Sequence, residues 1–240
     1  MPSKNYQELL SDPPAKESMM DQLTVDCCIF GFENNNLKIL LVQHASGRSK
    51  GQWALPGEFV LKDRNLKEVP HHVLQRLTGL ENIFVEQLGT FGRLDRVDYA
   101  RVITIAYYAL ISPQKYTLKV GADALDVAWV NISEVGNLIY DHNEIMDYAI
   151  VKLRDRIRTY PIGFELLPEK FTLTQIQKLY EAMLGHSLDT RNFRRKMLSS
   201  KLLQSTSEVD DSVPYRAPKL FTFDKKRYDE MLVEGYFFQL

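Results

Sequence analysis

The feature that most constrains the fold is a short amphipathic helix predicted within residues 66–80. Four apolar residues recur at the spacing that places side chains on one face of a helix: Val69, Val73, Leu74 and Leu77. Pro70 is tolerated only near the first helical turn, where a missing N–H costs little, and Gly79 is a typical helix stop. The pattern therefore predicts a helix that begins at 66 or 69, ends at 78 and buries one face.

Residues 58–80 also resemble the Nudix box, the motif whose glutamates hold Mg²⁺ or Mn²⁺ in Nudix hydrolases, and they fit its frame without a gap. Three positions match the motif: Leu74, Gly79 and Leu80. Its first glycine, first glutamate and arginine are replaced, in that order, by Glu58, Arg64 and His72. Its three later glutamates are replaced by Val73, Arg76 and Leu77. Hard divalent cations need oxygen ligands, so the sequence predicts a Nudix fold without a metal site, a catalytic residue or hydrolase activity.

Other metal ligands near the box are disfavoured by charge and geometry. Glu58 and Glu68 are candidate replacement ligands, but Arg64 and Arg76 bring positive charge to the same region and oppose a divalent cation. The adjacent His71 and His72 point about 100° apart on a helix and cannot easily bind one ion together.

Composition indicates a globular protein with two unlike parts. Residues 1–150 carry 14 Lys and Arg against 19 Asp and Glu, whereas residues 151–240 carry 16 against 12. Opposite charge on the two parts suggests separate tasks, with the basic part a candidate for polyanion contact. The adjacent Cys27 and Cys28 offer no disulfide framework, and neither a signal peptide nor a membrane span is evident. We therefore expect a soluble, cytoplasmic protein without membrane association.

The first part has the pattern of an α+β domain. Strand-forming runs occupy residues 23–32, 37–43, 52–55, 83–91, 101–110 and 126–131. A helix is predicted over 141–158. We expect a flexible arm at 1–20, then a Nudix-like α/β/α sandwich with a mixed sheet at 21–158. Residues 159–170 contain Pro161, Gly163 and Pro168, which break both periodicities and predict a linker.

The second part, residues 171–240, has the element order of a winged helix-turn-helix. Thr172 and Gln175 form a capping-box pattern at the start of a helix, and Gly185 ends it. The helix carries a continuous apolar stripe: Ile176, Leu179, Tyr180, Met183 and Leu184. A second helix at 190–199 is basic, and strands at 201–206 and 219–223 predict a hairpin, or wing.

This order predicts DNA binding, since one helix braces and the other lies in the major groove. Residues 186–227 carry ten Lys and Arg against five Asp and Glu. The candidate DNA contacts are Thr190, Arg191, Asn192, Arg194, Arg195, Lys201, Arg216 and Lys219. The alternative is a small helical tail with a solvated basic face.

A loop before the strand at 101–110 is the candidate effector site. Gly92 permits a close backbone approach, and three neighbours supply polar groups: Arg93, Asp95 and Arg96. An ordinary surface loop explains the same residues equally well.

Four stretches extend the resemblance to nearly the whole chain, residues 22–230: FGFENNNLKILLVQ, LTGLENIFVEQLGTFG, RVITIAYYAL and PIGFELLPEKFTLTQIQKLYEAMLG. They resemble the Nudix-related transcriptional regulators of bacteria, a family that includes ADP-ribose-sensing repressors of nicotinamide-cofactor metabolism and arabinose-utilisation regulators of Bacteroides. The resemblance implies a homodimer on a palindromic operator in double-stranded DNA, with a small effector in each Nudix domain. A sugar or sugar derivative is the first choice for that effector, ADP-ribose or another nucleotide-linked compound the second, and no cofactor is expected.

Two other functions remain open. The retained frame allows a metal-dependent hydrolase of nucleoside diphosphate sugars such as ADP-ribose, although Arg64, Val73, Arg76 and Leu77 oppose it. A protein-binding adaptor that uses the acidic part has no specific support.

Overall fold

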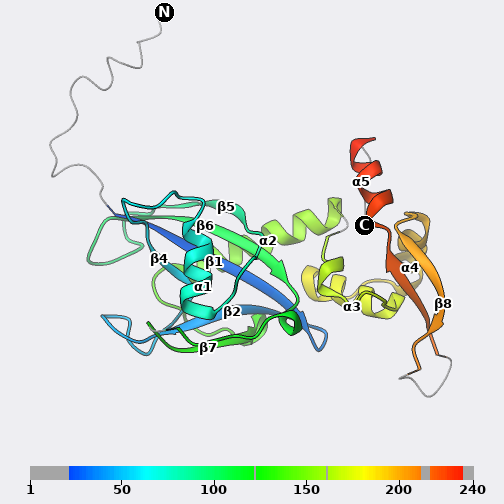
Figure 1. Ribbon diagram of the computed structural model, residues 1–240, viewed down its shortest axis with the longest axis horizontal. Helices are drawn as coiled ribbons and strands as arrows, with labels where there is room; N and C mark the ends of the chain where they lie inside the picture. Colours follow the sequence, from blue (N-terminus) through cyan, green and yellow to red (C-terminus); the bar gives the residue numbers. More distant parts are fainter. Residues whose placement is uncertain (1–21, 122, 161, 212–216, 235–240) are drawn as a thin grey trace, which may run out of the picture.

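The computed structural model describes residues 22–121, 123–160, 162–211 and 217–234. The expected arm at 1–20 and the candidate DNA contact Arg216 lie outside these residues. The described chain forms an α/β/α sandwich followed by a winged helix, which confirms the expected α+β class (Figure 1). None of the helices in these ranges has both the length and the apolar composition of a membrane span.

One mixed sheet forms the centre of the sandwich. Its strands are β1 (Gln22–Glu33), β2 (Asn36–His44), β3 (Trp53–Ala54), β4 (Gly57–Phe59), β5 (Glu86–Phe91), β6 (Val102–Ile111) and β7 (Ala124–Asn131). The order is β3-β2-β1-β6-β5, with β4 paired to β1 and β7 to β2. β1 and β6 run parallel, from Gln22 opposite Val102 to Gly31 opposite Ile111, and the other pairs are antiparallel.

A helix covers each face of the sheet: α1 (Val69–Thr78) and α2 (His142–Thr159). Successive residues of β1 point to opposite faces, so Val25 and Ile29 pack in the α1 cluster whereas Cys28 and Phe30 pack in the α2 cluster. This explains why β1 is a nearly continuous apolar run rather than an alternating one. α1 begins at Val69, one of the two expected starts, and is capped by Gly79 with φ 72°.

The winged helix has the expected element order. It consists of α3 (Leu173–Leu184), α4 (Thr190–Ser199), β8 (Leu203–Val209), β9 (Lys219–Phe223) and a further helix, α5 (Lys225–Val233). The capping box at α3 is complete, because Thr172 accepts from the Gln175 N–H and Gln175 accepts from the Thr172 N–H. Phe171 exchanges two backbone hydrogen bonds with Phe221, which ties the start of α3 to the wing.

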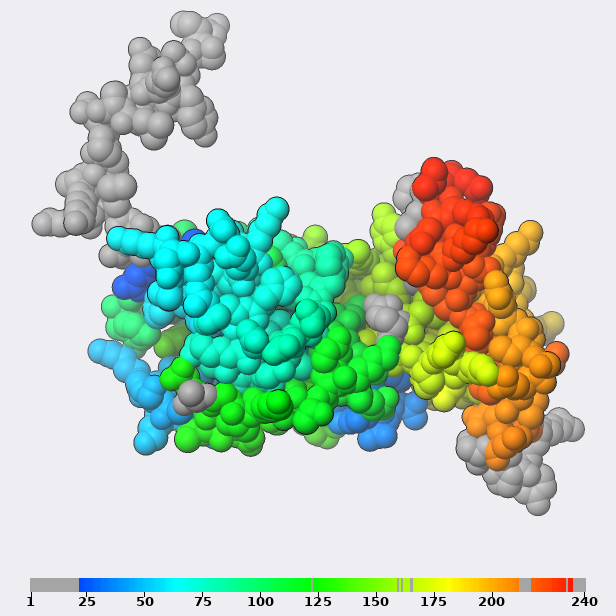
Figure 2. Space-filling view, in the orientation of Figure 1, coloured from blue at the N-terminus to red at the C-terminus, as the bar shows by residue number. Residues whose placement is uncertain are grey.

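Five elements of the described chain were not predicted from the sequence. β4 and α5 fall in this group, as do three 3-10 turns: η3 (Pro113–Lys115), η4 (Ile132–Glu134) and η5 (Phe164–Leu166). η5 lies in the segment expected to be a linker, and Phe164, Leu166 and Leu167 are buried there. These side chains belong to the same buried cluster as residues of α2 and α3. The sandwich and the winged helix therefore share one core where they meet. In the space-filling view the two parts lie directly against each other (Figure 2).

Candidate functional site

The box region is held together by ion pairs within the protein. Glu58 on β4 accepts from His72 Nδ1 at 2.6 Å and from Arg76 Nε at 3.0 Å. Arg76 also pairs with Asp123. Arg76 of α1 thus places a positive charge beside Glu58, at a position where the Nudix box has a glutamate.

The residues present do not fit the Mg²⁺ or Mn²⁺ of a Nudix enzyme. Val73 and Leu77, at two of the glutamate positions, are buried in the apolar cluster under α1. Arg64 and Arg76 occupy two further glutamate positions with positive charge. Among the described residues, no group of three or more His, Cys, Asp or Glu side chains is placed to hold a metal ion.

A cavity of about 120 Å³ lies beside the box, between β1, β4, the loop before β6 and the start of α2. Its polar lining residues are Thr24, Asp26, His44, Glu58, Arg96, Tyr99, Tyr140 and His142. Gly57 is required next to it, because a Cβ there would come within 2.1 Å of Asp26 Oδ1. We call this space the inner cavity.

The floor of the inner cavity is a buried charge cluster. Arg96 donates to both carboxylate oxygens of Asp141, at 2.9 and 2.8 Å, and lies 3.5 Å from Asp26. His142 Nδ1 accepts from the Leu55 N–H at 3.0 Å, so the proton of the neutral ring is on Nε2, 3.6 Å from Asp26 Oδ1. Burial lowers the pKa of His142, partly offset by Asp26 and Asp141. The cluster leaves acceptor and donor atoms along one wall of the cavity.

An outer cavity of about 430 Å³ adjoins the inner one and shares four of its lining residues. The hydroxyls of Tyr99 and Tyr140 lie 3.0 Å apart at this boundary, and Ser49 Oγ lies 3.0 Å from Tyr140. The hydrogen bond to Tyr140 and burial raise the pKa of Tyr99 to about 12. Arg48 covers the Tyr99 ring at 4.8 Å. The two tyrosines thus separate the chambers.

The three candidate effector residues take different positions. Arg96 lines both cavities and is buried, whereas Arg93 and Asp95 line only the outer cavity and are exposed. Arg93 lies 3.3 Å from Asp95 and 3.1 Å from Glu144. Six polar residues of the inner cavity were not predicted from the sequence: Thr24, Asp26, His44, Tyr99, Tyr140 and His142. Asp26 could have been identified from the sequence, because it is a charged residue inside the apolar run of β1.

In the winged helix, a polar brace fixes the turn between α3 and α4. Gln177 Nε2 donates to the Leu188 carbonyl at 3.3 Å and to Thr190 Oγ1 at 3.1 Å. Glu181 accepts from the Leu188 N–H at 3.0 Å and from Lys178. Lys178 and the Leu188 N–H together lower the pKa of Glu181 to about 2. Phe193 and Met197 of α4 are buried below, so the opposite side of α4 faces solvent.

Four candidate DNA contacts lie on this exposed surface of α4, Arg191, Asn192, Arg194 and Arg195, and Lys196 is exposed beside them. Lys201, directly after α4, and Lys219, at the start of β9, are exposed as well. Lys196 was not among the candidates. Arg194 donates to Thr174 Oγ1 and Arg195 to Asn192 Oδ1. Within the described chain, neither forms an ion pair with a carboxylate, and the same holds for Arg191. Thr190 is exposed, but its hydroxyl is engaged by Gln177.

Known proteins are similar to both the sandwich and the winged helix of this chain. Residues 163–223 match the family model of the NrtR DNA-binding winged helix domain. The chain is 32% identical over 211 residues to the ADPR responsive transcriptional repressor NtrR of Acinetobacter baylyi, covering 86% of this chain and 84% of that protein.

Two solved structures are also similar to this chain. NrtR of Shewanella oneidensis in complex with a 27mer DNA has a TM-score of 0.71 at 26% identity, over 90% of this chain and 97% of that one. The NUDIX domain of the same protein in complex with ADP ribose has a TM-score of 0.54 at 29% identity, over 62% of this chain and 99% of that one. The chain therefore belongs to the NrtR family of Nudix-related transcriptional regulators.

Proposed function

We propose that this regulator senses a small metabolite in a Nudix-like domain, residues 21–158, that has lost hydrolase activity. The observation that carries the proposal is the environment of Glu58. It is the carboxylate of the described box that faces the cavity, and His72 and Arg76 already bind both of its oxygens. A carboxylate neutralised in this way is a poor ligand for Mg²⁺.

The inner cavity favours a sugar as the effector. Its volume of about 120 Å³ is close to the roughly 150 Å³ of a protein cavity that holds a benzene-sized ring. Asp26, His142 and the two tyrosine hydroxyls offer the acceptors and donors that neighbouring sugar hydroxyls require. ADP-ribose is the second candidate, because a nucleotide-linked compound would have to extend through the Tyr99–Tyr140 boundary into the outer cavity.

A thermal-shift screen with pentoses, hexoses and ADP-ribose tests this site, because a ligand that binds the native state raises the unfolding temperature. A sugar is expected to shift the wild type, and Asp26→Asn is expected to abolish the shift. Asp126→Asn, an exposed aspartate on β7 of the same sheet, is the matched control and keeps it. A shift by ADP-ribose alone would favour the second candidate.

A phosphate-release assay on the wild-type protein tests whether hydrolase activity is retained. With Mg²⁺ or Mn²⁺ and a panel of nucleoside diphosphate sugars including ADP-ribose, phosphate release is expected to stay at background. Metal-dependent turnover that Glu58→Gln abolishes would instead establish the alternative, a hydrolase with unorthodox ligands.

For the winged helix, residues 171–240, we propose binding of a homodimer to a palindromic operator in the cytoplasm, because two-fold protein symmetry matches two half-sites. The exposed guanidinium groups of α4 support the proposal. A gel-shift assay with DNA from upstream of the protein's own operon should show a retarded band that high salt weakens. Equal binding to random DNA would contradict it.

A further inference from the structure

α2 connects the effector cavities to the winged helix. Its 18 residues span about 27 Å at 1.5 Å per residue. At its start, Asp141 receives both hydrogen bonds of Arg96, and His142 lines the inner cavity. Any ligand that changes the contacts of Arg96 or His142 therefore acts directly on the first turn of α2.

At the other end, Arg154 contacts the corner between α3 and the turn to α4. Its Nε donates to the Met183 carbonyl at 3.3 Å, in the last turn of α3. Its guanidinium also lies against Gly185, where a Cβ would come within 2.7 Å of a terminal nitrogen. Gly185 has φ 76° and caps α3. A cation at a helix C-terminus is favoured by the helix dipole and satisfies a carbonyl that the helix leaves unpaired.

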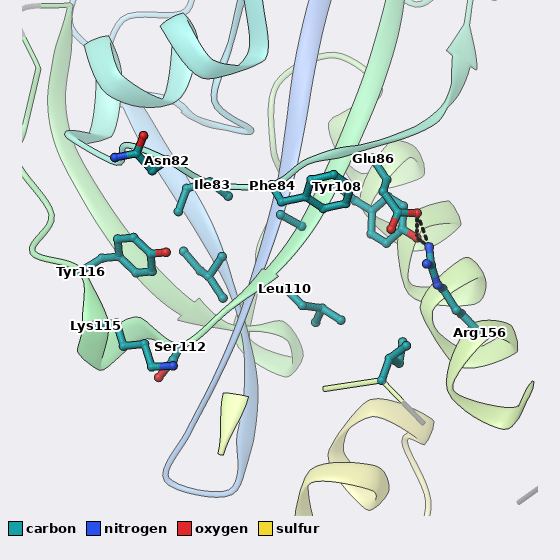
Figure 3. A pocket seen from close by; sticks show the side chains of 13 residues that line it. Asn82, Ile83, Phe84, Glu86, Tyr108, Leu110, Ser112, Lys115, Tyr116 and Arg156 are labelled. Atoms are coloured by element: carbon teal, nitrogen blue, oxygen red, sulfur yellow. Dashed lines mark hydrogen bonds and ion pairs between the residues drawn. The ribbon is translucent and has the colours of Figure 1, made fainter. Parts of the chain in front are cut away.

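Two further contacts prevent α2 from moving alone. Leu153 and Ile157 are fully buried in the cluster that includes Leu179 and Met183 of α3. On the sheet side, Arg156 donates to Glu86 and to the Tyr108 hydroxyl, in a pocket lined by residues of the sandwich and by Ile162 (Figure 3). Close-packed groups of this kind transmit small displacements instead of absorbing them.

We infer that Arg154 is the positioning residue that couples the effector cavity to the DNA-reading helix. This inference rests on the proposed function. Arg154 holds the α3 corner immediately before the turn that leads into α4, so a shift of α2 is passed to the orientation of α4. Without the guanidinium, each site binds its own ligand but the two sites no longer influence each other.

Coupling between sites is reciprocal, so it can be measured with DNA alone and without knowing the effector. We would measure hydrogen exchange of the 143–149 amides in the free protein and with saturating DNA from upstream of its own operon. In the wild type, DNA is expected to change their exchange by about fivefold or more. Arg154→Met keeps the aliphatic stem but loses the guanidinium, and should abolish this change while still binding DNA. Arg154→Lys restores a donor to the Met183 carbonyl and should recover most of it.

Arg158→Ala is the matched control, because Arg158 is an exposed arginine on the same helix whose ion pair is with Asp155. It should retain the full response. The inference is overturned if wild-type exchange at 143–149 does not respond to DNA, if Arg154→Met responds fully, or if Arg158→Ala loses the response to the same degree. A wild type that binds no DNA at all would instead reject the proposed function, and the inference with it.

Discussion

The arginines beside the Nudix-like cavity and those of α4 are used in opposite ways. Arg96 is buried between Asp26 and Asp141, and Arg76 is paired with Glu58 and Asp123. On α4, Arg191, Arg194 and Arg195 are exposed, and none of them pairs with a carboxylate of the described chain. The first set is neutralised by carboxylates of the same chain, whereas the second is exposed and is not neutralised by any carboxylate of the described residues.

The presence or absence of an internal partner separates two kinds of charge in this chain. A charge with a buried partner changes stability when it is removed, because the partner is left behind unpaired. An exposed charge without a partner changes ligand affinity and leaves stability almost unaffected. Substitutions in the two sets should therefore have opposite effects on stability and on DNA affinity.

The largest effect is expected for Arg96→Met. This change leaves Asp26 and Asp141 buried without their cation, and breaking a buried pair in this way costs roughly 3–5 kcal/mol. The free energy of unfolding, measured with urea, should fall by that amount. Arg93→Met, an exposed arginine of the same loop, should change it little, and equal losses for both variants would contradict the contrast.

The next effect concerns DNA. Arg191→Ala and Arg195→Ala should each weaken operator binding by about 1–3 kcal/mol if the side chain reads a base edge. A uniform loss on operator and random DNA, with a smaller salt slope, would assign the residue to a phosphate instead. Gel shifts at several salt concentrations give both quantities. Arg158→Ala on α2 is the control that should bind as the wild type does.

Much of the fold follows from the sequence, because local patterns dominate there. The apolar run of β1, the stripe of α3 and the caps at Thr172 and Gly79 are local signals, and the structure confirms the elements they predict. β4 has three residues and α5 has nine, so neither is long enough to show several repeats of its period.

The cavity is less predictable because its walls come from distant segments. Asp26, His44, Tyr99 and His142 meet only after β1, β2, the loop before β6 and α2 have packed together. The spacing of these residues in the sequence therefore does not predict that they are close together in the fold. The loop around Arg96 was singled out from its residue types, but its buried pair with Asp141 could not be foreseen, since 45 residues separate the two. The roles of the candidate effector and DNA residues stay predictions.

A pH effect of intermediate size should come from His142. Burial lowers its pKa below the usual 6.5 in the folded state, so the unfolded chain binds a proton more readily. Stability from the neutral ring is therefore complete above pH 6.5 and is lost as the pH falls from there towards the folded pKa, by at most about 1.4 kcal/mol per pH unit.

Unfolding free energies measured between pH 7.5 and 5.5 test this sign. His142→Asn keeps an acceptor for the Leu55 N–H but removes the titrating ring, so its stability should depend less on pH than that of the wild type. His186→Asn, an exposed histidine of the α3–α4 turn, should keep the wild-type slope. A steeper slope in His142→Asn would contradict the assignment of a neutral ring.

The smallest effect is expected for Arg76→Met, and it completes the contrast. Arg76 is 32% exposed, so solvent screens its pairs, and losing them should lower the unfolding free energy by about 1 kcal/mol or less. Glu58 keeps His72 as a partner, which limits the cost further. DNA affinity should not change. Arg195→Met is the mirror experiment, with unchanged stability and weaker DNA binding. If Arg76→Met weakened DNA binding as much as Arg195→Met does, internal pairing would not separate structural from functional arginines in this protein.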